Sequence, residues 1–365
     1  METLFEVSSA SRRLSETFAL RNVNLALRPG EIVGFVGANG AGKTAVIRAI
    51  LGLLHLDAGE IRLFDEPFGV NAPNEAQRRL RGRIGVVFDT CPFPAELKVK
   101  QAIACLAPAF SRWDTRRFAS LLDEFGISPK AKVRDLSRGM SMKLQLAVAL
   151  SHGADLLILD EATAGLDPIA RDGVLDRLRE FASEGQRGVL LSSHITSDLE
   201  RVADRIVGID AGRIAFNLPR EHITDAAGIA HCTADQARKV LSVYAGLNDA
   251  SGFDMPTSTP AAMQTAPAVH NAASKSKTAG QPANSEAPRT SSADHAAHTA
   301  PAENRPDPFA TFGIITPRAI RRPFCTDVLV ADRFAFAQAF PEIACDRATI
   351  EDYLQFALNG ELQLH

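Results

Sequence analysis

The chain has 365 residues, of which 45% are hydrophobic and 23% charged, and its formal net charge is −3. This composition is ordinary for a globular protein and allows one large core or two smaller domains. It gives no electrostatic reason to expect nucleic acid as a partner, because that contact relies on many Lys and Arg side chains against phosphate.

The start of the chain and its five cysteines exclude further classes. Residues 1–6 lack the basic start and apolar region of a signal peptide, and no later run is apolar enough to span a bilayer. The cysteines are scattered, without a CxxC pair or a histidine at zinc spacing. We expect a cytoplasmic chain with reduced thiols that reaches a membrane only through a partner.

The first patterned segment is a glycine-rich stretch between an apolar strand, residues 32–36, and a helix predicted to run through Leu54. The pattern G-x-x-x-x-G-K-[ST] is filled by Gly37, Ala38, Asn39, Gly40, Ala41, Gly42, Lys43 and Thr44. This order is typical of a P-loop, in which backbone N–H groups and a helix N-terminus bind phosphate. We expect Lys43 to neutralise β- and γ-phosphate charge and the Thr44 hydroxyl to ligate Mg²⁺.

A helical lobe is predicted at about residues 97–135. Its apolar stripe consists of Trp113, Phe118, Leu121, Leu122 and Phe125. A stripe of this kind is far more often core than a ligand cage.

Residues 156–161, with the sequence LLILDE, predict a central parallel strand that ends in two carboxylates. Ligands collect at the carboxyl ends of such strands. Asp160 is then placed to hold Mg²⁺ through water, and Glu161 to orient or deprotonate an attacking water. Alone, an acidic pair is more often a solvated strand end; downstream of a P-loop, the functional interpretation is favoured.

The last third of the chain contains a long low-complexity segment. Ala, Pro, Ser and Thr dominate residues 249–311, and no large apolar or aromatic residue occurs between His270 and Pro308. Such a segment cannot offset the entropy of ordering, so we predict a disordered linker. Beyond it, residues 327–330 predict a strand, and Thr349 heads an amphipathic helix that needs a surface to pack on.

Three short motifs between and after these segments resemble those of ABC transporter ATPases. Residues 136–140, LSRGM, resemble the signature usually written LSGGQ; residues 164–168, AGLDP, resemble the D-loop; and His194 resembles the switch histidine. The resemblance implies an α/β P-loop NTPase of ABC type, with an antiparallel β subdomain, the helical lobe and a small α+β C-terminal extension. The implied boundaries are 1–220 for the ATPase domain, 221–248 and 312–365 for the extension, and 249–311 for the linker.

In this family two cassettes face each other head to tail, and each ATP lies between one P-loop and the other subunit's signature. The resemblance thus implies that Ser137 and Gly139 contact the γ-phosphate in trans at a helix N-terminus. It implies that His194 bridges the γ-phosphate and Glu161, and that Asp167 couples the two sites. The implied cofactors are ATP and Mg²⁺. The implied partners are a second cassette, identical or a paralogue, and a multi-helix membrane permease at the inner face of the cell membrane.

Asp89 stands at the position of the usual Q-loop Gln, after the strand at residues 84–88. We predict it as a candidate metal ligand beside Thr44 and Asp160, although its charge also brings repulsion near the γ-phosphate. Further along the connector, Phe93 is predicted either to anchor a cytoplasmic helix of the permease or to pack into the helical lobe.

Other positions also depart from the family pattern. Arg138 and Met140 replace the usual Gly and Gln of the signature, and Ala162 replaces the usual Pro after the catalytic Glu. Ungapped alignment places Leu14 where an adenine-stacking aromatic is usual, with Phe18 as a substitute.

Within the family, residues 86–93, 136–144 and 192–200 are similar to a bacterial subgroup of drug- and peptide-exporter ATPases. Two rival functions are disfavoured. A soluble ABC protein acting on ribosomes or DNA usually carries two cassettes or a long coiled coil, whereas this chain has one P-loop and too short a span at residues 90–135. A module that binds ATP without hydrolysing it conflicts with the intact catalytic positions.

Overall fold

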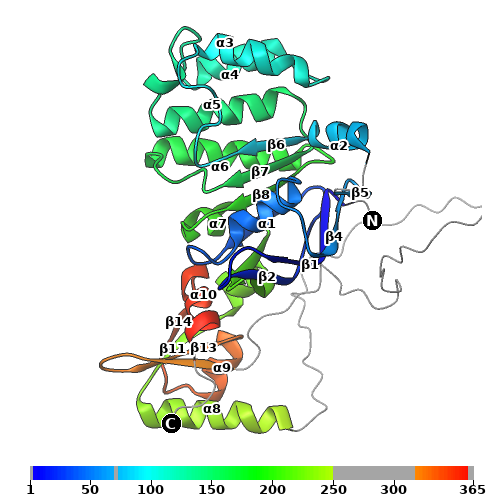
Figure 1. Cartoon of the computed structure of the whole chain (residues 1–365). Helices are drawn as coiled ribbons and strands as arrows, with labels where there is room; N and C mark the ends of the chain where they lie inside the picture. The colour runs from blue at the N-terminus through cyan, green and yellow to red at the C-terminus, as the bar shows by residue number, and fades with distance from the viewer. Residues whose placement is uncertain (1–2, 70–72, 250–316, 361–365) are drawn as a thin grey trace, which may run out of the picture.

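The computed structural model describes residues 3–69, 73–249 and 317–360. The predicted linker, residues 249–311, lies outside the described residues except for its first residue, so its disorder stays a prediction. The described chain forms a helical lobe, a central sheet with an antiparallel sheet beside it, and a C-terminal sheet (Figure 1).

The central sheet has six strands, and its neighbouring pairs are parallel except for β10 against β9. In spatial order the strands are β10 (Arg213–Pro219), β9 (Arg205–Asp210), β3 (Ile32–Val36), β8 (Gly188–Ser192), β7 (Leu156–Asp160) and β6 (Ile84–Val87). Every residue of β3, β7 and β8 is buried, as expected for a parallel sheet covered on both faces. The carboxyl ends of these strands lie side by side at one edge of the sheet.

The antiparallel sheet takes two strands from before the P-loop segment and two from after it. Its order is β2 (Ala19–Leu27), β1 (Phe5–Arg13), β4 (Ala58–Leu63) and β5 (Glu66–Phe68). Its apolar side chains join those of β3 and α1 in one core, which fixes the P-loop against it.

The P-loop helix α1 (Lys43–Ile50) is shorter than predicted, because the sequence pattern suggested a helix through Leu54. Gly52 adopts a left-handed conformation, with φ +68°. The Gly52 and Leu53 N–H groups bond back to Ala49 and Arg48, which is the Schellman arrangement that ends a helix. A glycine two positions after Ile50 therefore overrides the apolar periodicity.

The helical lobe contains α3 (Val99–Leu106), α4 (Thr115–Glu124) and α5 (Arg138–Ser151). Phe118, Leu121 and Leu122 are buried in its core, and Trp113 and Phe125 pack against it, which confirms the stripe as core. Trp113 lies in the loop before α4, which Asp114 caps. The remaining helices of the ATPase part are α2 (Asn74–Arg81), α6 (Pro168–Ser183) and α7 (Thr196–Val202).

The C-terminal sheet joins segments from both sides of the predicted linker. Its order is β12 (Arg318–Arg321), β13 (Thr326–Val330), β11 (Gly228–Cys232) and β14 (Cys345–Arg347), with α8 (Ala234–Asp249), α9 (Arg333–Ala339) and α10 (Ile350–Asn359) around it. Strand β11 pairs with β13 in antiparallel register, Ala230 opposite Val328. The predicted strand and the Thr349-capped helix are thus both confirmed.

Helix α10 packs on the ATPase part of the chain rather than on its own sheet alone. The Tyr353 ring meets Phe216 of β10 edge-on, with ring centroids 5.0 Å apart. The Ile350 amide donates to Glu200 of α7 at 2.9 Å. This is the surface that the amphipathic helix requires.

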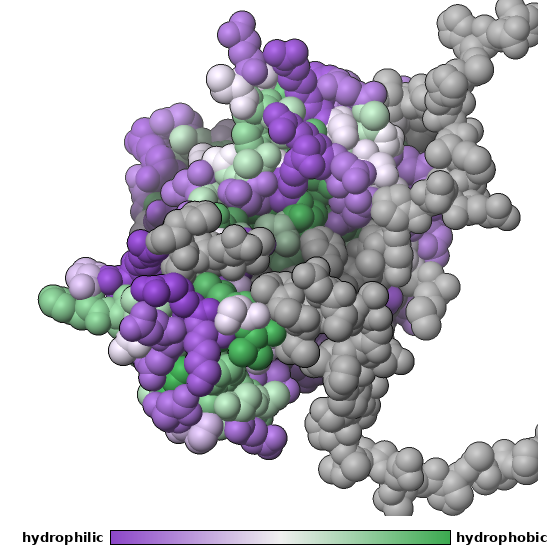
Figure 2. All heavy atoms as spheres, turned by 90° about the horizontal axis from the view of Figure 1, so that it is seen from below, coloured by the Kyte–Doolittle hydropathy of each residue, from purple (hydrophilic) through white to green (hydrophobic). Residues whose placement is uncertain are grey.

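The hairpin of β12 and β13 projects from the C-terminal sheet (Figure 1). Seen from below, a hydrophobic tip projects on the left, and other hydrophobic patches lie among hydrophilic residues on the same face (Figure 2). The turn between the two strands contains Phe324, which is fully exposed. Among the helices within the described ranges, none has the length and apolar character needed to cross a membrane.

Candidate functional site

The turn between β3 and α1 has the backbone of a phosphate cradle. Gly40 and Gly42 have φ of +81° and +117°, a left-handed region that favours glycine. A Cβ on Gly37 would lie 2.4 Å from the carbonyl oxygen of Ile209, so only glycine fits there. The turn leads directly into the N-terminus of α1, whose dipole favours an anion.

A cavity of about 350 Å³ opens at this turn. It is lined by Leu14, Phe18, Ala38, Asn39, Gly40, Gly42, Lys43, Thr44, Ala45, Arg48, Leu54 and Glu161. Both candidates for the adenine-stacking position, Leu14 and Phe18, thus lie on the wall beside the P-loop. Phe18 also lies close to the glycines, since its ring would be 3.2 Å from a Cβ on Gly42. The polar turn and the apolar wall together fit a nucleoside triphosphate.

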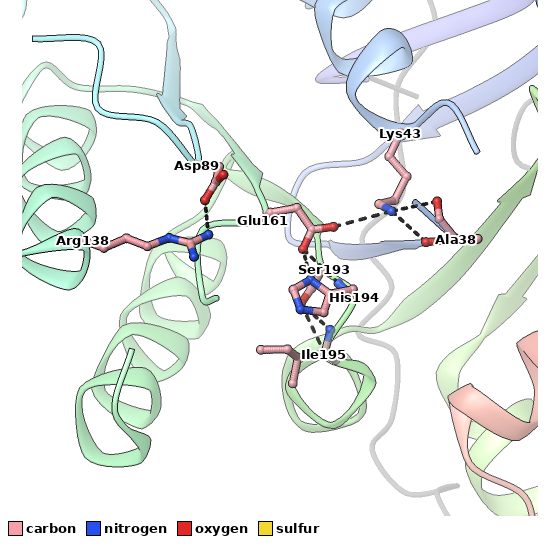
Figure 3. Close-up of polar contacts among 9 residues, drawn as sticks. Ala38, Lys43, Asp89, Arg138, Glu161, Ser193, His194 and Ile195 are labelled. Carbon is pink, nitrogen blue, oxygen red and sulfur yellow. Dashed lines mark hydrogen bonds and ion pairs between the residues drawn. The ribbon is translucent and has the colours of Figure 1, made fainter. Parts of the chain in front are cut away.

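Lys43 is nearly buried and its ammonium is held at the sheet edge. Its Nζ donates to the carbonyl oxygens of Gly37 at 2.7 Å and Ala38 at 3.3 Å. The same nitrogen lies 3.5 Å from Oε1 of Glu161 (Figure 3). The P-loop lysine and the predicted catalytic carboxylate therefore meet within one chain.

Glu161 is also held by His194 on its other side (Figure 3). Oε2 of Glu161 contacts Nδ1 of His194 and accepts from the His194 backbone N–H at 3.1 Å. The Glu161 backbone has φ +54°, an uncommon conformation for a residue other than glycine, and its N–H donates to Ser192. The turn after β7 thus aims the Glu161 carboxylate between the P-loop and His194.

Asp160 ends β7 directly before Glu161 and is buried. Within the described ranges, its Oδ1 atom has no hydrogen-bond partner. Burial raises the pKa of this carboxyl above its ordinary value, while the nearby Thr44 and Ser192 hydroxyls and Lys43 oppose the rise. A buried carboxylate oxygen without a partner beside the Thr44 hydroxyl is a donor set that suits Mg²⁺.

Ser137, Gly139 and Asp167 do not line this cavity. Ser137 is exposed and caps α5 by accepting from the Met140 amide at 3.2 Å, which places Gly139 in the first turn of that helix. Asp167 is exposed and caps α6 by accepting from the Ala170 amide at 3.0 Å. Their predicted roles therefore need a second cassette and stay predictions.

Asp89 is not brought beside Asp160 or Thr44 by any contact that the structure shows. Its carboxylate forms an ion pair with Arg138, the first residue of α5 (Figure 3). Across the described chain, no group of three or more His, Cys, Asp or Glu side chains is arranged to hold a metal ion. The role of Asp89 as a metal ligand stays a prediction, and its observed partner is the guanidinium.

Sequence reasoning missed Gln145. This buried residue of α5 accepts from the Phe88 N–H at 2.9 Å and donates to the Phe88 carbonyl at 3.0 Å. The Gln145 amide therefore satisfies both backbone groups of Phe88, the residue that follows β6, as a neighbouring strand would. The available signal was a lone amide in the apolar run LQLAVAL, residues 144–150.

A family model described as "ABC transporter" matches residues 20–164. Over 258 residues the chain is 34% identical to the Nod factor export ATP-binding protein I of Burkholderia thailandensis, a match that covers 68% of this chain and 83% of the relative. Over 225 residues it is 31% identical to the bacitracin transport ATP-binding protein BcrA of Bacillus licheniformis, with 61% and 72% covered.

Solved structures show the same fold. A structure of the ATP-binding subunit of an ABC transporter matches with a TM-score of 0.55 and 28% identity, covering 60% of this chain and 91% of that one. A dimeric post-hydrolysis cassette bound to ADP and Pi matches with a TM-score of 0.54, covering 59% of this chain and 98% of that one. At 19% identity, this second likeness concerns the fold alone.

Proposed function

Because this chain belongs to the ATP-binding subunits of ABC transporters, we propose that it is the motor of an exporter, which hydrolyses ATP between two cassettes and drives a separate membrane permease. The observation that carries the chemistry is the position of Glu161 between Lys43 and His194 at the mouth of the P-loop cavity. The export direction rests on the names of the relatives, which refer to Nod factor export and bacitracin transport.

Hydrolysis requires a base for water and compensation for phosphate charge. Glu161 is the base: it orients water and accepts its proton while His194 fixes the carboxylate from the other side. Lys43 leaves the carbonyls of Gly37 and Ala38 and neutralises charge on the β- and γ-phosphates of the substrate. The P-loop N–H groups position those phosphates. Catalysis of phosphoryl transfer then depends on positioning and charge stabilisation, without a covalent intermediate on the protein.

Thr44 and Asp160 are the residues that would hold Mg²⁺, because their oxygens lie together beside the cavity and the Asp160 Oδ1 atom lacks a protein partner within the described ranges. When bound, this ion would offset the negative charge that develops on the phosphate oxygens. Its charge would also oppose the rise in the pKa of Asp160 that burial causes.

The second cassette would complete the site. Ser137 and the N-terminus of α5 are exposed and away from the chain's own cavity, which is how an anion site used in trans would lie. Beside Asp167, Ile169 leaves 85% of its surface exposed, an apolar contact available to a partner cassette.

The permease would dock beside the connector that carries Phe93. That side chain is half-buried and packs against the core of the helical lobe, so part of its ring remains available. Phe93→Ala tests this: a docking anchor loses permease binding and transport while the isolated cassette still folds and hydrolyses ATP. A core residue instead loses several kcal/mol of stability, on the order of 3.

The experiment for the proposed function measures phosphate release from MgATP by the purified chain, alone and with its permease in vesicles. We expect basal hydrolysis that rises steeply with protein concentration, because the complete site needs two cassettes. Hydrolysis that stays proportional to protein concentration from dilute monomer upward would contradict the dimeric site. Export from the vesicles requires added ATP.

A further inference from the structure

Helix α5 holds two consecutive residues of the connector after β6. Arg138, at its first position, pairs with the Asp89 carboxylate, and Gln145 bonds both the N–H and the carbonyl of Phe88 (Figure 3 shows the first of these contacts). Arg138 and Gln145 are seven residues apart, about two helical turns, so both project from the same face of α5. The signature helix and the connector are thereby attached at two points.

The Arg138 side chain also reaches the D-loop. A Cβ on Gly165, whose φ is +84°, would lie 3.2 Å from the Cδ atom of Arg138. At the next residue of α5, a Cβ on Gly139 would lie 3.0 Å from Leu166. One arginine therefore touches the connector and the D-loop from the N-terminus of the signature helix.

The charges of the pair compensate each other. A cation at the first position of a helix is disfavoured by the positive end of the helix dipole, and the Asp89 carboxylate offsets this for Arg138. The register pairs Val87 with Leu159, so Asp89 leaves β6 at the level where Glu161 leaves β7. An uncompensated Asp89 would add a third carboxylate, after Asp160 and Glu161, at the edge where the proposed function requires anionic phosphate to bind.

Stability of the fold does not account for the pair. The side chains of Arg138 and Asp89 are 55% and 53% exposed, and ion pairs in that environment contribute little to folding. The pair differs in position from other surface pairs, such as Arg79 with Glu66, which are 56% and 42% exposed: Asp89 follows β6 at the sheet edge where Glu161 follows β7.

We propose that Arg138 and Asp89 are a mutually dependent positioning pair, in which Arg138 neutralises Asp89 at the sheet edge that also carries Glu161 and holds the connector against the signature helix and the D-loop. This rests on the proposed function, because the charge matters only if anionic nucleotide binds at that edge. Asp89 in place of the usual Gln and Arg138 in place of the usual Gly are thus one coupled change. Replacing only one of them with the usual residue should impair the site.

A double-mutant cycle tests the proposal, with Arg138→Gln, Asp89→Asn and the double variant assayed for KM and kcat with MgATP at low salt. Arg138→Gln should raise KM about 10-fold, the scale of one like-charge contact at short range. The double variant should return to within about 3-fold of wild type, because no unpaired carboxylate remains. Added salt should shrink the Arg138→Gln defect, since screening weakens exposed charges.

Three results would overturn the proposal. A KM defect that persists in the double variant would mean that Arg138 acts on nucleotide without Asp89. A matched control, Arg79→Gln, should leave KM unchanged, and an equal rise there would reduce the effect to general surface charge. A melting temperature of Arg138→Gln more than a few degrees below wild type would assign the pair to folding.

Binding of a fluorescent ATP analogue to wild type, the two single variants and the double variant separates this proposal from the proposed function. If wild type binds the analogue but releases no phosphate, hydrolysis is wrong while the cycle still tests the pair. If wild-type turnover is normal but the effects of the two single substitutions on affinity and KM add up to the effect of the double variant, the two residues act independently. The proposed pair is then wrong, and the ATPase assignment stands.

Discussion

Oε1 of Glu161 lies 3.5 Å from Nζ of Lys43, so the residue proposed as the base for water contacts the residue proposed to neutralise phosphate. Each charge thus has a compensating partner inside a largely buried site. In the proposed mechanism, bound phosphate would become the anionic partner of Lys43. Glu161 would keep its contact with His194 and face the attacking water.

Lys43→Ala should weaken MgATP binding by about 10- to 100-fold, because a charged hydrogen-bond donor is worth about 1.5–3 kcal/mol. Titration with a fluorescent ATP analogue measures this. Arg48→Ala, on the same helix and also at the cavity wall, serves as the comparison, since it removes a cation that is not in the G-K-T motif. Equal losses in both variants would contradict a specific role for Lys43.

Gln145→Leu should lower the free energy of unfolding by about 1–3 kcal/mol, because it leaves the Phe88 N–H and carbonyl without their side-chain partner. Urea denaturation measures the loss. Gln145→Glu keeps one acceptor for the N–H and should recover part of it. Unchanged stability in the Leu variant would show that the connector does not depend on this amide.

Tyr353→Ala should cost about 3–5 kcal/mol, since this ring is almost fully buried against Phe216 where α10 meets β10. Phe334→Ala provides the control, because Phe334 is 61% exposed and its removal should change stability little. Thermal unfolding of the full chain measures both. If the two variants have the same melting temperature, α10 does not share a core with the ATPase part of the chain.

Stability of the C-terminal sheet should fall as pH rises through the pKa of His231. Hydrogen bonds to Asp327, at 2.8 Å, and Asp346, at 3.1 Å, raise the pKa of His231. A raised folded-state pKa gives stability that is fully present below the unfolded value, about 6.5, and is lost as pH rises through the folded value. Asp327 has a lowered pKa, so its own contribution is lost only under acid conditions.

Melting curves of wild type and His231→Asn between about pH 5.5 and pH 9 measure this effect, because that range includes the ordinary histidine pKa and values above it. The advantage of wild type over the variant should shrink as pH rises. Because His231 is 41% exposed, solvent screening keeps the difference small. An advantage that grows with pH would mean that the charged histidine destabilises the sheet, which is the opposite of what its two carboxylate partners predict.

The parts of the site that could be predicted from sequence are those that a short run of adjacent residues determines. Glycines at left-handed turns, Lys43 at the start of α1 and the two acids at the end of β7 need only their neighbours to be placed. The position of Glu161 beside both Lys43 and His194 follows from adjacent parallel strands.

The unpredicted parts depend on contacts between distant segments or on one turn residue. The pair of Asp89 and Arg138 joins residues 49 positions apart, and each alone resembles an ordinary surface charge. The shorter α1 depends on Gly52, whose left-handed turn outweighs apolar Leu54. The pairing of β11 with β13 spans the low-complexity segment, so no local pattern indicates it.

The most direct test of the mechanism is the rate of phosphate release by Glu161→Gln together with its oligomeric state in MgATP. Removing the base should slow hydrolysis by at least about 100-fold. Nucleotide binding should persist, because the P-loop and Lys43 are untouched, and the variant should accumulate as an ATP-bound dimer in light scattering. Near-normal turnover by Glu161→Gln would contradict the assignment of Glu161 as the base, and with it the mechanism proposed for this site.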